Sequence, residues 1–263
     1  MTGTSRYVDA GEVRLHALEY GAGAPVSIVI VPGITSPAPT WEFVSEALAR
    51  DYHVVCLDVR GRGLSDRPAT GYTLPAYAAD VAALIDGLGL ERPAVLGHSM
   101  GARIATAFGV LHPQRRGPLI VVDPPLTGPG RPSYGTPLQA FLDELRAAER
   151  GDDTPTRKLF PQWSDEHVAR RVEWLPSCDD TAIAETYRNF DDEDFFGFWQ
   201  QLGPRVQFIW GRESHAVSEA GAQEVAEANP AAQVVAVAGA GHMVPWDNLP
   251  GFLEVTRRFL AEV

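Results

Sequence analysis

The chain has 263 residues, 45% of them hydrophobic, and a formal net charge of −12 at pH 7. This length and hydrophobic content suit one α/β domain with an insertion, and the acidic balance argues against nucleic acid or an anionic membrane surface as a partner. Two cysteines, Cys56 and Cys178, are too few and too far apart for a disulfide framework. With no apolar signal region at the start and no run long enough to span a bilayer, we expect a cytoplasmic protein.

Strand and helix patterns alternate along the first half of the chain. Residues 7–20 predict a β-hairpin that turns at Ala10-Gly11, and residues 26–31 form a nearly continuous apolar strand, as in a parallel sheet covered on both faces. The next predicted elements are a helix at 41–50, a strand at 53–58, a helix at 77–88, a short strand at 95–96, a helical run at 104–111 and a buried strand at 119–123.

A serine motif lies between that short strand and the helical run. Gly97-His98-Ser99-Met100-Gly101 has the form Gly-x-Ser-x-Gly, which in a strand–turn–helix context is typical of a nucleophile elbow. The small residues Gly97 and Gly101 let strand and helix approach closely, and a strained backbone at Ser99 would leave its hydroxyl free. Such a pattern also arises by chance, but the predicted context favours Ser99 as a nucleophile.

The second half of the chain breaks the alternation and then resumes it. From about Gly128 to Gly203 strand signals disappear, and the sequence becomes helical, acidic and rich in aromatic residues. A strand at 206–210, a helix at 218–228, a strand at 233–237 and a last helix at 251–263 follow. The order predicts an α/β-hydrolase fold: a doubly wound, mainly parallel sheet of about eight strands formed by residues 1–127 and 204–263, with residues 128–203 as a helical cap over the carboxyl edge.

A serine nucleophile needs a base that removes its proton. His242 lies in the loop after the last predicted strand, and this loop returns to the sheet edge where the elbow serine is exposed. Other histidines fall in strand patterns, at a helix end, inside the elbow or in the cap. His242 is therefore the predicted base.

The acid that orients the base is missing from its usual position. The loop after the strand that follows the cap carries Ser214 and His215 where an aspartate is expected. Asp123 interrupts an apolar run at the end of the neighbouring strand, from which a carboxylate can reach His242. We predict Asp123 as the acid and keep Glu213 as the alternative, whereas Asp247 is too close to His242 in sequence.

The oxyanion of an acyl-transfer intermediate needs two backbone N–H donors. One is expected from Met100, the residue after the nucleophile, and the second from Ile34 in the loop after the 26–31 strand.

Several segments together are more specific than the elbow, above all the Pro-Gly-Ile-Thr-Ser-Pro and Asp-Pro-Pro segments. These segments, which span nearly the whole chain, are 31–37, 57–65, 97–103, 122–125, 128–131, 163–166 and 241–247. They resemble the N-formylmaleamate deformylases, a family of α/β-hydrolases of bacterial nicotinate and hydroxypyridine breakdown. The resemblance implies Ser99, Asp123 and His242 as the triad, hydrolysis of an N-formyl amide to maleamate and formate, and no metal or organic cofactor.

The resemblance also implies a small monocarboxylate substrate, which the net charge of −12 would repel unless a basic group holds it. Arg103, on the same helical face as Ser99, and Arg131, at the cap entry, are the candidates. The alternatives are a buried structural ion pair for Arg103 and a solvated side chain for Arg131. The hydroxyls and amides around Thr35 and Ser36 could hold the anion instead, and Trp41 belongs either to the pocket wall or to the core.

Other functions remain open at this point. An esterase or a C–C bond hydrolase of ring-cleavage products would share the architecture, as would a cofactor-free oxygenase or lyase. A non-enzymatic ligand receptor is disfavoured by the complete set of Ser99, Asp123 and His242. The sequence does not indicate an oligomeric state.

Overall fold

Strand β5, which ends at the serine motif, lies near the middle of an eight-stranded sheet in the computed structural model, which describes residues 3–262. The strand order is β1-β2-β4-β3-β5-β6-β7-β8; β1 pairs antiparallel with β2 and β2 with β4, and the other neighbours are parallel. The strands are β1 (Thr4–Asp9), β2 (Arg14–Tyr20), β3 (Ser27–Val31), β4 (His53–Asp58), β5 (Ala94–His98), β6 (Leu119–Val122), β7 (Val206–Gly211) and β8 (Gln233–Val237). The predicted mainly parallel sheet is confirmed.

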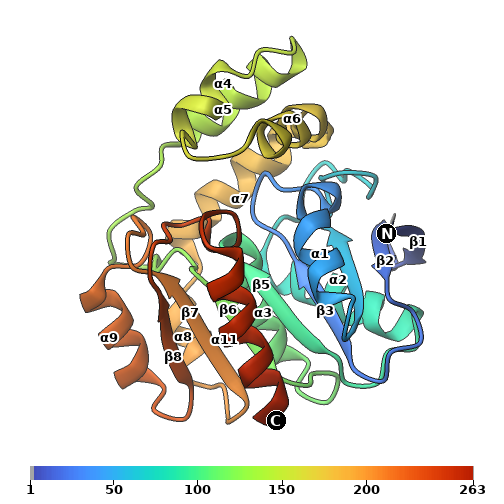
Figure 1. Ribbon diagram of the computed structural model, residues 1–263, viewed down its shortest axis with the longest axis vertical. Coiled ribbons are helices and arrows are strands. Elements are labelled where there is room, and N and C mark those ends of the chain that lie inside the picture. The colour runs from blue at the N-terminus through green and yellow to red at the C-terminus, as the bar shows by residue number, and fades with distance from the viewer. Residues whose placement is uncertain (1–2, 263) are drawn as a thin grey trace.

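Helices cover both faces of the sheet, as Figure 1 shows. Alternate strand residues point to opposite faces, so Ile28 and Ile30 enter one apolar cluster and Val29 and Val31 the other. The first cluster is completed by α1 (Glu42–Leu48), the turn η1 (Ala38–Trp41) before it and α11 (Leu249–Glu262), and the second by α2 (Leu74–Gly87), α3 (Met100–Leu111), α8 (Phe195–Trp199) and α9 (Glu219–Ala228). The sheet is therefore doubly wound.

The segment between β6 and β7 is helical, and most of it stands above one end of the sheet (Figure 1). It comprises α4 (Leu138–Glu149), α5 (Thr154–Leu159), α6 (Asp165–Trp174), the turn η2 (Leu175–Ser177), α7 (Asp180–Asp192) and α8. The last of these, α8, packs beside α3 and α9, and Trp199 contacts Phe208 of β7. The helices of this segment therefore pack against different partners: α8 covers one face of the sheet, while the earlier helices stand above the end of the sheet.

Element boundaries differ from the predicted ones mainly at helix starts. Helix α2 begins at Leu74, three residues before the predicted start, because the Thr73 hydroxyl caps it by accepting from the Ala76 N–H (3.4 Å). Helix α3 begins at Met100, directly after the serine. The short helix α10 (Val244–Asp247) precedes α11. The predicted end of the last helix at Val263, like Met1 and Thr2, lies outside the described residues. Within residues 3–262, no helix has both the length and the apolar character needed to cross a membrane.

Candidate active site

Ser99 occupies a strained turn between β5 and α3. Its backbone has φ 55° and ψ −118°, a conformation that non-glycine residues rarely adopt and that is held here by the strand and helix on either side. A Cβ at Gly101 would overlap the Val31 carbonyl, and one at Gly97 would overlap the main chain of Gly101. Glycine at both positions is what lets α3 lie against β3 and β5, as the motif predicts.

A chain of hydrogen bonds links the serine to a buried carboxylate. The Ser99 Oγ lies 3.1 Å from Nε2 of His242, and Nδ1 of His242 lies 2.7 Å from Oδ2 of Asp123. These residues come from the ends of β5 and β6 and from the loop after β8, which meet at the carboxyl edge of the sheet. The structure therefore brings together the three residues that the sequence assigns to a triad.

Asp123 is held by donors from the neighbouring strand. The Ser214 hydroxyl donates to Oδ2 (2.6 Å) and the Gly211 N–H donates to Oδ1 (3.0 Å). Burial raises the pKa of the Asp123 carboxyl, while these two hydrogen bonds act in the opposite direction. Ser214, which stands where the acid was expected, thus supports the acid on the adjacent strand.

The two other carboxylates considered from the sequence face elsewhere. Glu213 is exposed, and Asp247 accepts from the Gly241 N–H (2.8 Å) and from the Gln162 side chain (2.8 Å). Neither makes a hydrogen bond with His242 among the described residues, so the geometry favours Asp123.

His242 is suited to act as a neutral base. Burial lowers the pKa of its imidazole, because the charged form loses hydration. Nε2 of His98 lies 2.8 Å from the His242 carbonyl oxygen, so the elbow also holds the loop that carries the base. The neutral ring can donate from Nδ1 to Asp123 and accept the Ser99 proton at Nε2.

We expect the acid limb of the pH–rate profile to lie below pH 6.5. With His242 as the predicted base, its neutral form is the active one; because its pKa is depressed, activity should be retained down to that lowered pKa and lost as the pH falls through it. The measurement is kcat/KM for p-nitrophenyl acetate between pH 4 and 9, with the protein's melting temperature followed over the same range. A limb centred above pH 6.5 in folded protein would contradict this assignment.

Two backbone N–H groups stand free near the serine. Those of Ile34 and Met100 have no hydrogen-bond acceptor within the described part of the chain. The loop after β3 passes close to the elbow, since a Cβ built on Gly33 would lie 3.5 Å from the Ser99 Cβ. Met100 is the first residue of α3, where N–H groups are unsatisfied and favour negative charge. Both donors can therefore face an oxyanion on a carbon bonded to Ser99.

A cavity of about 110 Å³ opens above the serine. Thr35 and Ser36 line it, and their predicted contact with substrate stays a prediction. The residues that complete its polar wall come from the helical segment and from the loop after β7: Tyr134, Thr136, Glu144, Arg171 and His215. No group of three or more His, Cys, Asp or Glu side chains within residues 3–262 is placed to hold a metal ion.

Arg103 is a buried structural residue. Its guanidinium donates to the carbonyls of Pro125 (2.9 Å) and Thr127 (3.1 Å) and contacts the Glu193 carbonyl. It does not line the cavity, so the prediction that it binds substrate is wrong. The alternative of a buried ion pair is also wrong in detail, because its partners among the described residues are carbonyls and a hydroxyl.

Arg131 and Trp41 also lie outside the cavity. Arg131 forms a bidentate ion pair with Glu224 of α9 (2.8 and 2.7 Å) at the surface. Trp41 is fully buried and packs edge-on against Trp246 with ring centroids 4.9 Å apart. Burial of Trp41 supports its core alternative, and the ion pair to Glu224 favours a structural role for Arg131.

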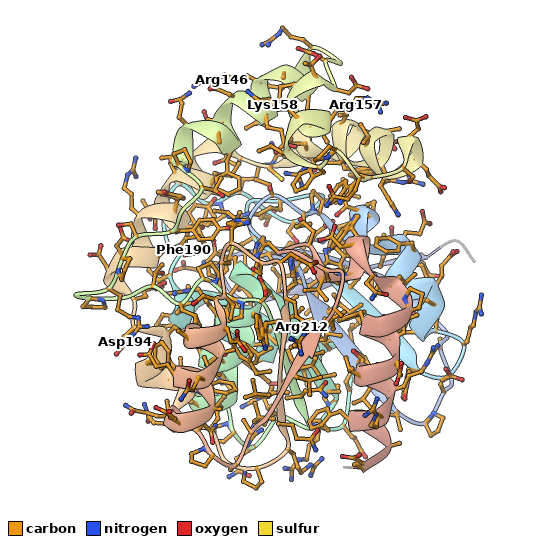
Figure 2. The ribbon with its side chains drawn as sticks, turned by 60° about the vertical axis from the view of Figure 1, so that its left-hand side comes forward. Arg146, Arg157, Lys158, Phe190, Asp194 and Arg212 are labelled. Carbon is orange, nitrogen blue, oxygen red and sulfur yellow. The ribbon has the colours of Figure 1, made fainter. Side chains whose placement is uncertain are left out.

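Three basic side chains of the helical segment lie at its outer end, away from the sheet. Figure 2 shows Arg146, Arg157 and Lys158 at the outer end of α4 and α5. Arg157 pairs there with Asp153 and Asp165, each at 2.8 Å. Among the described residues that line the cavity, Arg171 is therefore the permanent cation.

Arg171 reaches the cavity from α6 together with a buried partner. Its Nε and Nη2 donate to the two carboxylate oxygens of Glu144 on α4, each at 2.6 Å. The same guanidinium donates to the carbonyl (3.3 Å) and hydroxyl (3.0 Å) of Thr35. In the sequence, Arg171 and Glu144 look like ordinary charged residues of polar helices, and no local signal distinguishes them.

The comparisons with known proteins agree with this geometry. The model of the alpha/beta hydrolase fold family matches residues 26–249. The chain is 41% identical over 261 residues to N-formylmaleamate deformylase of Pseudomonas putida, covering 96% of this chain and 95% of that protein. The chain belongs to the α/β-hydrolase family. The strand order of the sheet, and the position of the serine turn directly after β5, are those expected of a hydrolase in this family.

Two further relatives extend the comparison. The crystal structure of a serine-to-alanine variant of N-formylmaleamic acid deformylase from Pseudomonas putida S16 superposes with a TM-score of 0.90 at 36% identity, covering 96% of this chain and all of that one. The 2-(acetamidomethylene)succinate hydrolase of Mesorhizobium japonicum is 27% identical, over 91% of this chain and 89% of that enzyme. Both similarities extend through the helical segment as well as the sheet.

Proposed function

We propose that this protein is a serine hydrolase that removes the formyl group from N-formylmaleamate, giving maleamate and formate. The observation that carries the proposal is the hydrogen-bonded series Ser99–His242–Asp123 at the floor of a small cavity. The 41% identity to a deformylase, over 96% of this chain and 95% of that protein, supports the substrate. The proposed location is the cytoplasm, as predicted from the sequence.

The first half of the proposed reaction forms a formyl-enzyme. Ser99 Oγ attacks the formyl carbon as its proton passes to Nε2 of His242, and the carbonyl oxygen becomes an oxyanion that accepts from the N–H groups of Ile34 and Met100. Asp123 stabilises the imidazolium by accepting from Nδ1. His242 then gives the proton to the amide nitrogen, the C–N bond breaks and maleamate leaves. Its nitrogen is conjugated to a second carbonyl and so leaves more readily than an alkylamine.

The second half returns the enzyme to its starting state. A water molecule gives a proton to His242 and attacks the formyl carbon of the ester on Ser99. The tetrahedral intermediate collapses, the serine recovers its proton from His242, and formate leaves. The sum is the addition of one water across the C–N bond, with no oxidant or reductant consumed.

We further propose that helices α4–α7 act as a cap that shapes this cavity for a small acid. Phe141 and Phe160 supply apolar wall, and Arg171 supplies the positive charge for the substrate carboxylate. Glu144 takes Nε and one N–H of Nη2, so Nη1 keeps an N–H beyond the one that it gives to Thr35. This residue replaces Arg103 and Arg131 in the role that the sequence suggested for them.

The test of the function is direct. Purified protein is incubated with N-formylmaleamate, and formate and maleamate are measured in equal amounts against a boiled control. Esters and C–C ring-cleavage substrates are assayed in parallel. Faster turnover of one of those, with no formate released from N-formylmaleamate, would overturn the proposal.

Replacing Arg171 by methionine should separate acidic from neutral substrates. A charge-assisted hydrogen bond contributes about 1.5–3 kcal/mol, so kcat/KM for N-formylmaleamate should fall roughly ten- to a hundredfold, while that for p-nitrophenyl acetate should change little. The measurement is the ratio of the two kcat/KM values. Equal losses on both substrates would contradict carboxylate binding by Arg171.

The same substitution carries a stability cost that must be measured with it. Removing one member of a buried ion pair strands Glu144 and costs about 3–5 kcal/mol, whereas Arg157→Met on the neighbouring exposed pair should cost about 0–1 kcal/mol. Arg171→Lys, which keeps the charge, is the matched variant for selectivity and should retain a preference for the acidic substrate.

A further inference from the structure

The loop that supplies the Ile34 N–H is fixed through its carbonyl groups. Each of three consecutive carbonyls accepts a hydrogen bond: Gly33 from the Ser36 N–H (3.2 Å), Ile34 from Nε of Arg62 (3.0 Å) and Thr35 from Nη1 of Arg171 (3.3 Å). A peptide plane is rigid, so holding the Gly33 oxygen fixes the Ile34 N–H in the same plane, and holding the Ile34 oxygen fixes the plane that follows and with it the backbone of Ile34 on both sides. The loop therefore presents its free N–H in one orientation.

Arg62 is unusual among these partners because its charge is buried without a carboxylate. Its side chain is among the largest fully buried ones, with 1% of the residue exposed. Within the described residues no carboxylate lies at ion-pair distance from it, and its acceptors are the carbonyls of Ile34, Arg60 and Ala182, the hydroxyls of Tyr77 and Thr186, and the Met100 sulfur. Burying a cation without a counter-ion lowers the stability of the fold. A functional role for Arg62 would explain why the protein carries this cost.

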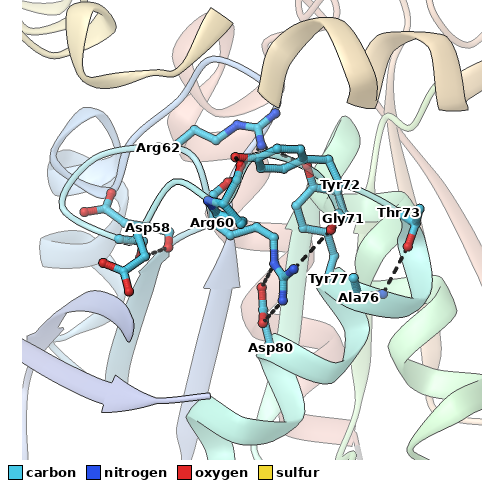
Figure 3. Close-up of polar contacts among 12 residues, drawn as sticks. Asp58, Arg60, Arg62, Gly71, Tyr72, Thr73, Ala76, Tyr77 and Asp80 are labelled. Carbon is cyan, nitrogen blue, oxygen red and sulfur yellow. Dashed lines mark hydrogen bonds and ion pairs between the residues drawn. The ribbon is translucent and has the colours of Figure 1, made fainter. Parts of the chain in front are cut away.

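The neighbouring arginine shows the ordinary solution. Two residues earlier in the same turn, Arg60 makes a bidentate ion pair with Asp80 of α2, with both hydrogen bonds at 2.6 Å. Figure 3 shows the two guanidinium groups directed apart, that of Arg60 to Asp80 and that of Arg62 to the Tyr77 hydroxyl. Among the described residues the Arg60 guanidinium donates to Asp80 and Gly71 and not to Ile34 or Met100, so the turn contains a buried arginine with a carboxylate partner and one without.

We propose that Arg62 is a positioning residue for the oxyanion hole. It holds the Ile34 carbonyl and touches the Met100 side chain, and so contacts both residues whose N–H groups would receive the oxyanion. Its positive charge lacks a counter-ion until the intermediate forms, so a negative oxygen nearby is stabilised in a site that water does not screen. This inference rests on the serine mechanism proposed above.

A competing explanation is purely structural. Arg62 also donates to Thr186 (3.1 Å) and Ala182 (3.4 Å) of α7, and so ties the cap segment to the sheet. A structural role would lower stability and the fraction of folded enzyme, whereas a role at the oxyanion hole would weaken binding of the negatively charged intermediate by each folded molecule. The experiment must separate these two effects.

The probe is methylboronic acid, which adds to a serine hydroxyl and forms a tetrahedral anion of the kind that the hole would bind. For Arg62→Met we expect kcat/KM for p-nitrophenyl acetate and the affinity for methylboronic acid to fall by the same factor, roughly ten- to a hundredfold. That is below the 10²–10³ seen when an oxyanion donor itself is removed. Arg62→Lys should lose less, because it keeps the charge.

Arg60→Met is the matched control, since it removes a buried arginine of the same turn without touching the hole. After correction for folded fraction, it should leave both quantities within twofold of the wild type. If Arg62→Met does not fold, the lysine variants Arg62→Lys and Arg60→Lys are compared instead. We then expect Arg62→Lys to bind methylboronic acid at least threefold more weakly than Arg60→Lys.

The proposal would be overturned if a folded Arg62 variant bound methylboronic acid as tightly as its Arg60 control. The outcome is separate from the fate of the deformylase proposal, because p-nitrophenyl acetate and methylboronic acid require only the serine and its hole. Loss of boronic acid binding in Ser99→Ala establishes that the probe reports on the serine, and binding that persists there would overturn the serine mechanism itself.

Discussion

Ser99→Ala is expected to abolish turnover while leaving the fold intact. Removing the serine of a triad elsewhere costs on the order of 10⁶ in kcat, because the residual rate comes from the oxyanion hole and binding alone. Alanine is smaller than serine, and the backbone at φ 55° is fixed by β5 and α3 rather than by the hydroxyl. The measurements are formate release and the melting temperature of wild type and variant.

The control for this substitution is Ser36→Ala, which removes a hydroxyl from the same cavity but not from the hydrogen-bonded series. It should retain most of the activity. Activity of Ser99→Ala within a factor of ten of the wild type would show that Ser99 is not the nucleophile.

Asp123→Asn should reduce kcat by about 10⁴, the effect seen when the acid of another triad is replaced by its amide. Asparagine keeps the shape but can present an N–H to Nδ1 of His242, which favours the wrong tautomer for accepting the Ser99 proton. Because Asp123 is fully buried and also accepts from Ser214 and Gly211, the variant should lose some stability as well.

Glu213→Gln is the paired measurement, and it should change kcat less than twofold because that side chain is exposed. If the glutamine variant instead lost activity while Asp123→Asn kept it, the acid would come from the loop after β7. Kinetics on both variants at pH 8, where His242 is neutral, make the comparison independent of the base.

The sequence predicts the fold well because its signals are local and regular. Buried parallel strands such as β3 and β4 are continuous apolar runs. Glycine at positions 97 and 101 indicates that the backbone of α3 lies too close to β3 and β5 for a larger residue. The convergence of Ser99, Asp123 and His242 is also observed, since the carboxyl ends of parallel strands meet at one edge. Their catalytic roles remain predictions until the variants are measured.

The substrate wall could not be predicted for the opposite reason. Arg171 and Glu144 lie 27 residues apart on two polar helices and meet only because α4 and α6 pack together. Sequence position near the elbow and the cap entry makes Arg103 and Arg131 candidates, but in the structure Arg103 donates to backbone carbonyls and Arg131 pairs with Glu224. Which arginine stays available is decided by tertiary partners, and a single sequence does not reveal those.

The placement of Asp123 after β6 has a consequence for how such an enzyme can diversify. The loop after β7 supplies only a hydroxyl, that of Ser214, to the Asp123 carboxylate, and its next residue, His215, lines the cavity with its Nε2 3.3 Å from the Tyr134 hydroxyl. A loop that had to supply the acid itself would tolerate few changes beside it. Here the ligand-facing residues of that loop can vary while the carboxylate stays anchored on another strand. Substitutions at position 215 are therefore a starting point for directed evolution toward other acyl groups.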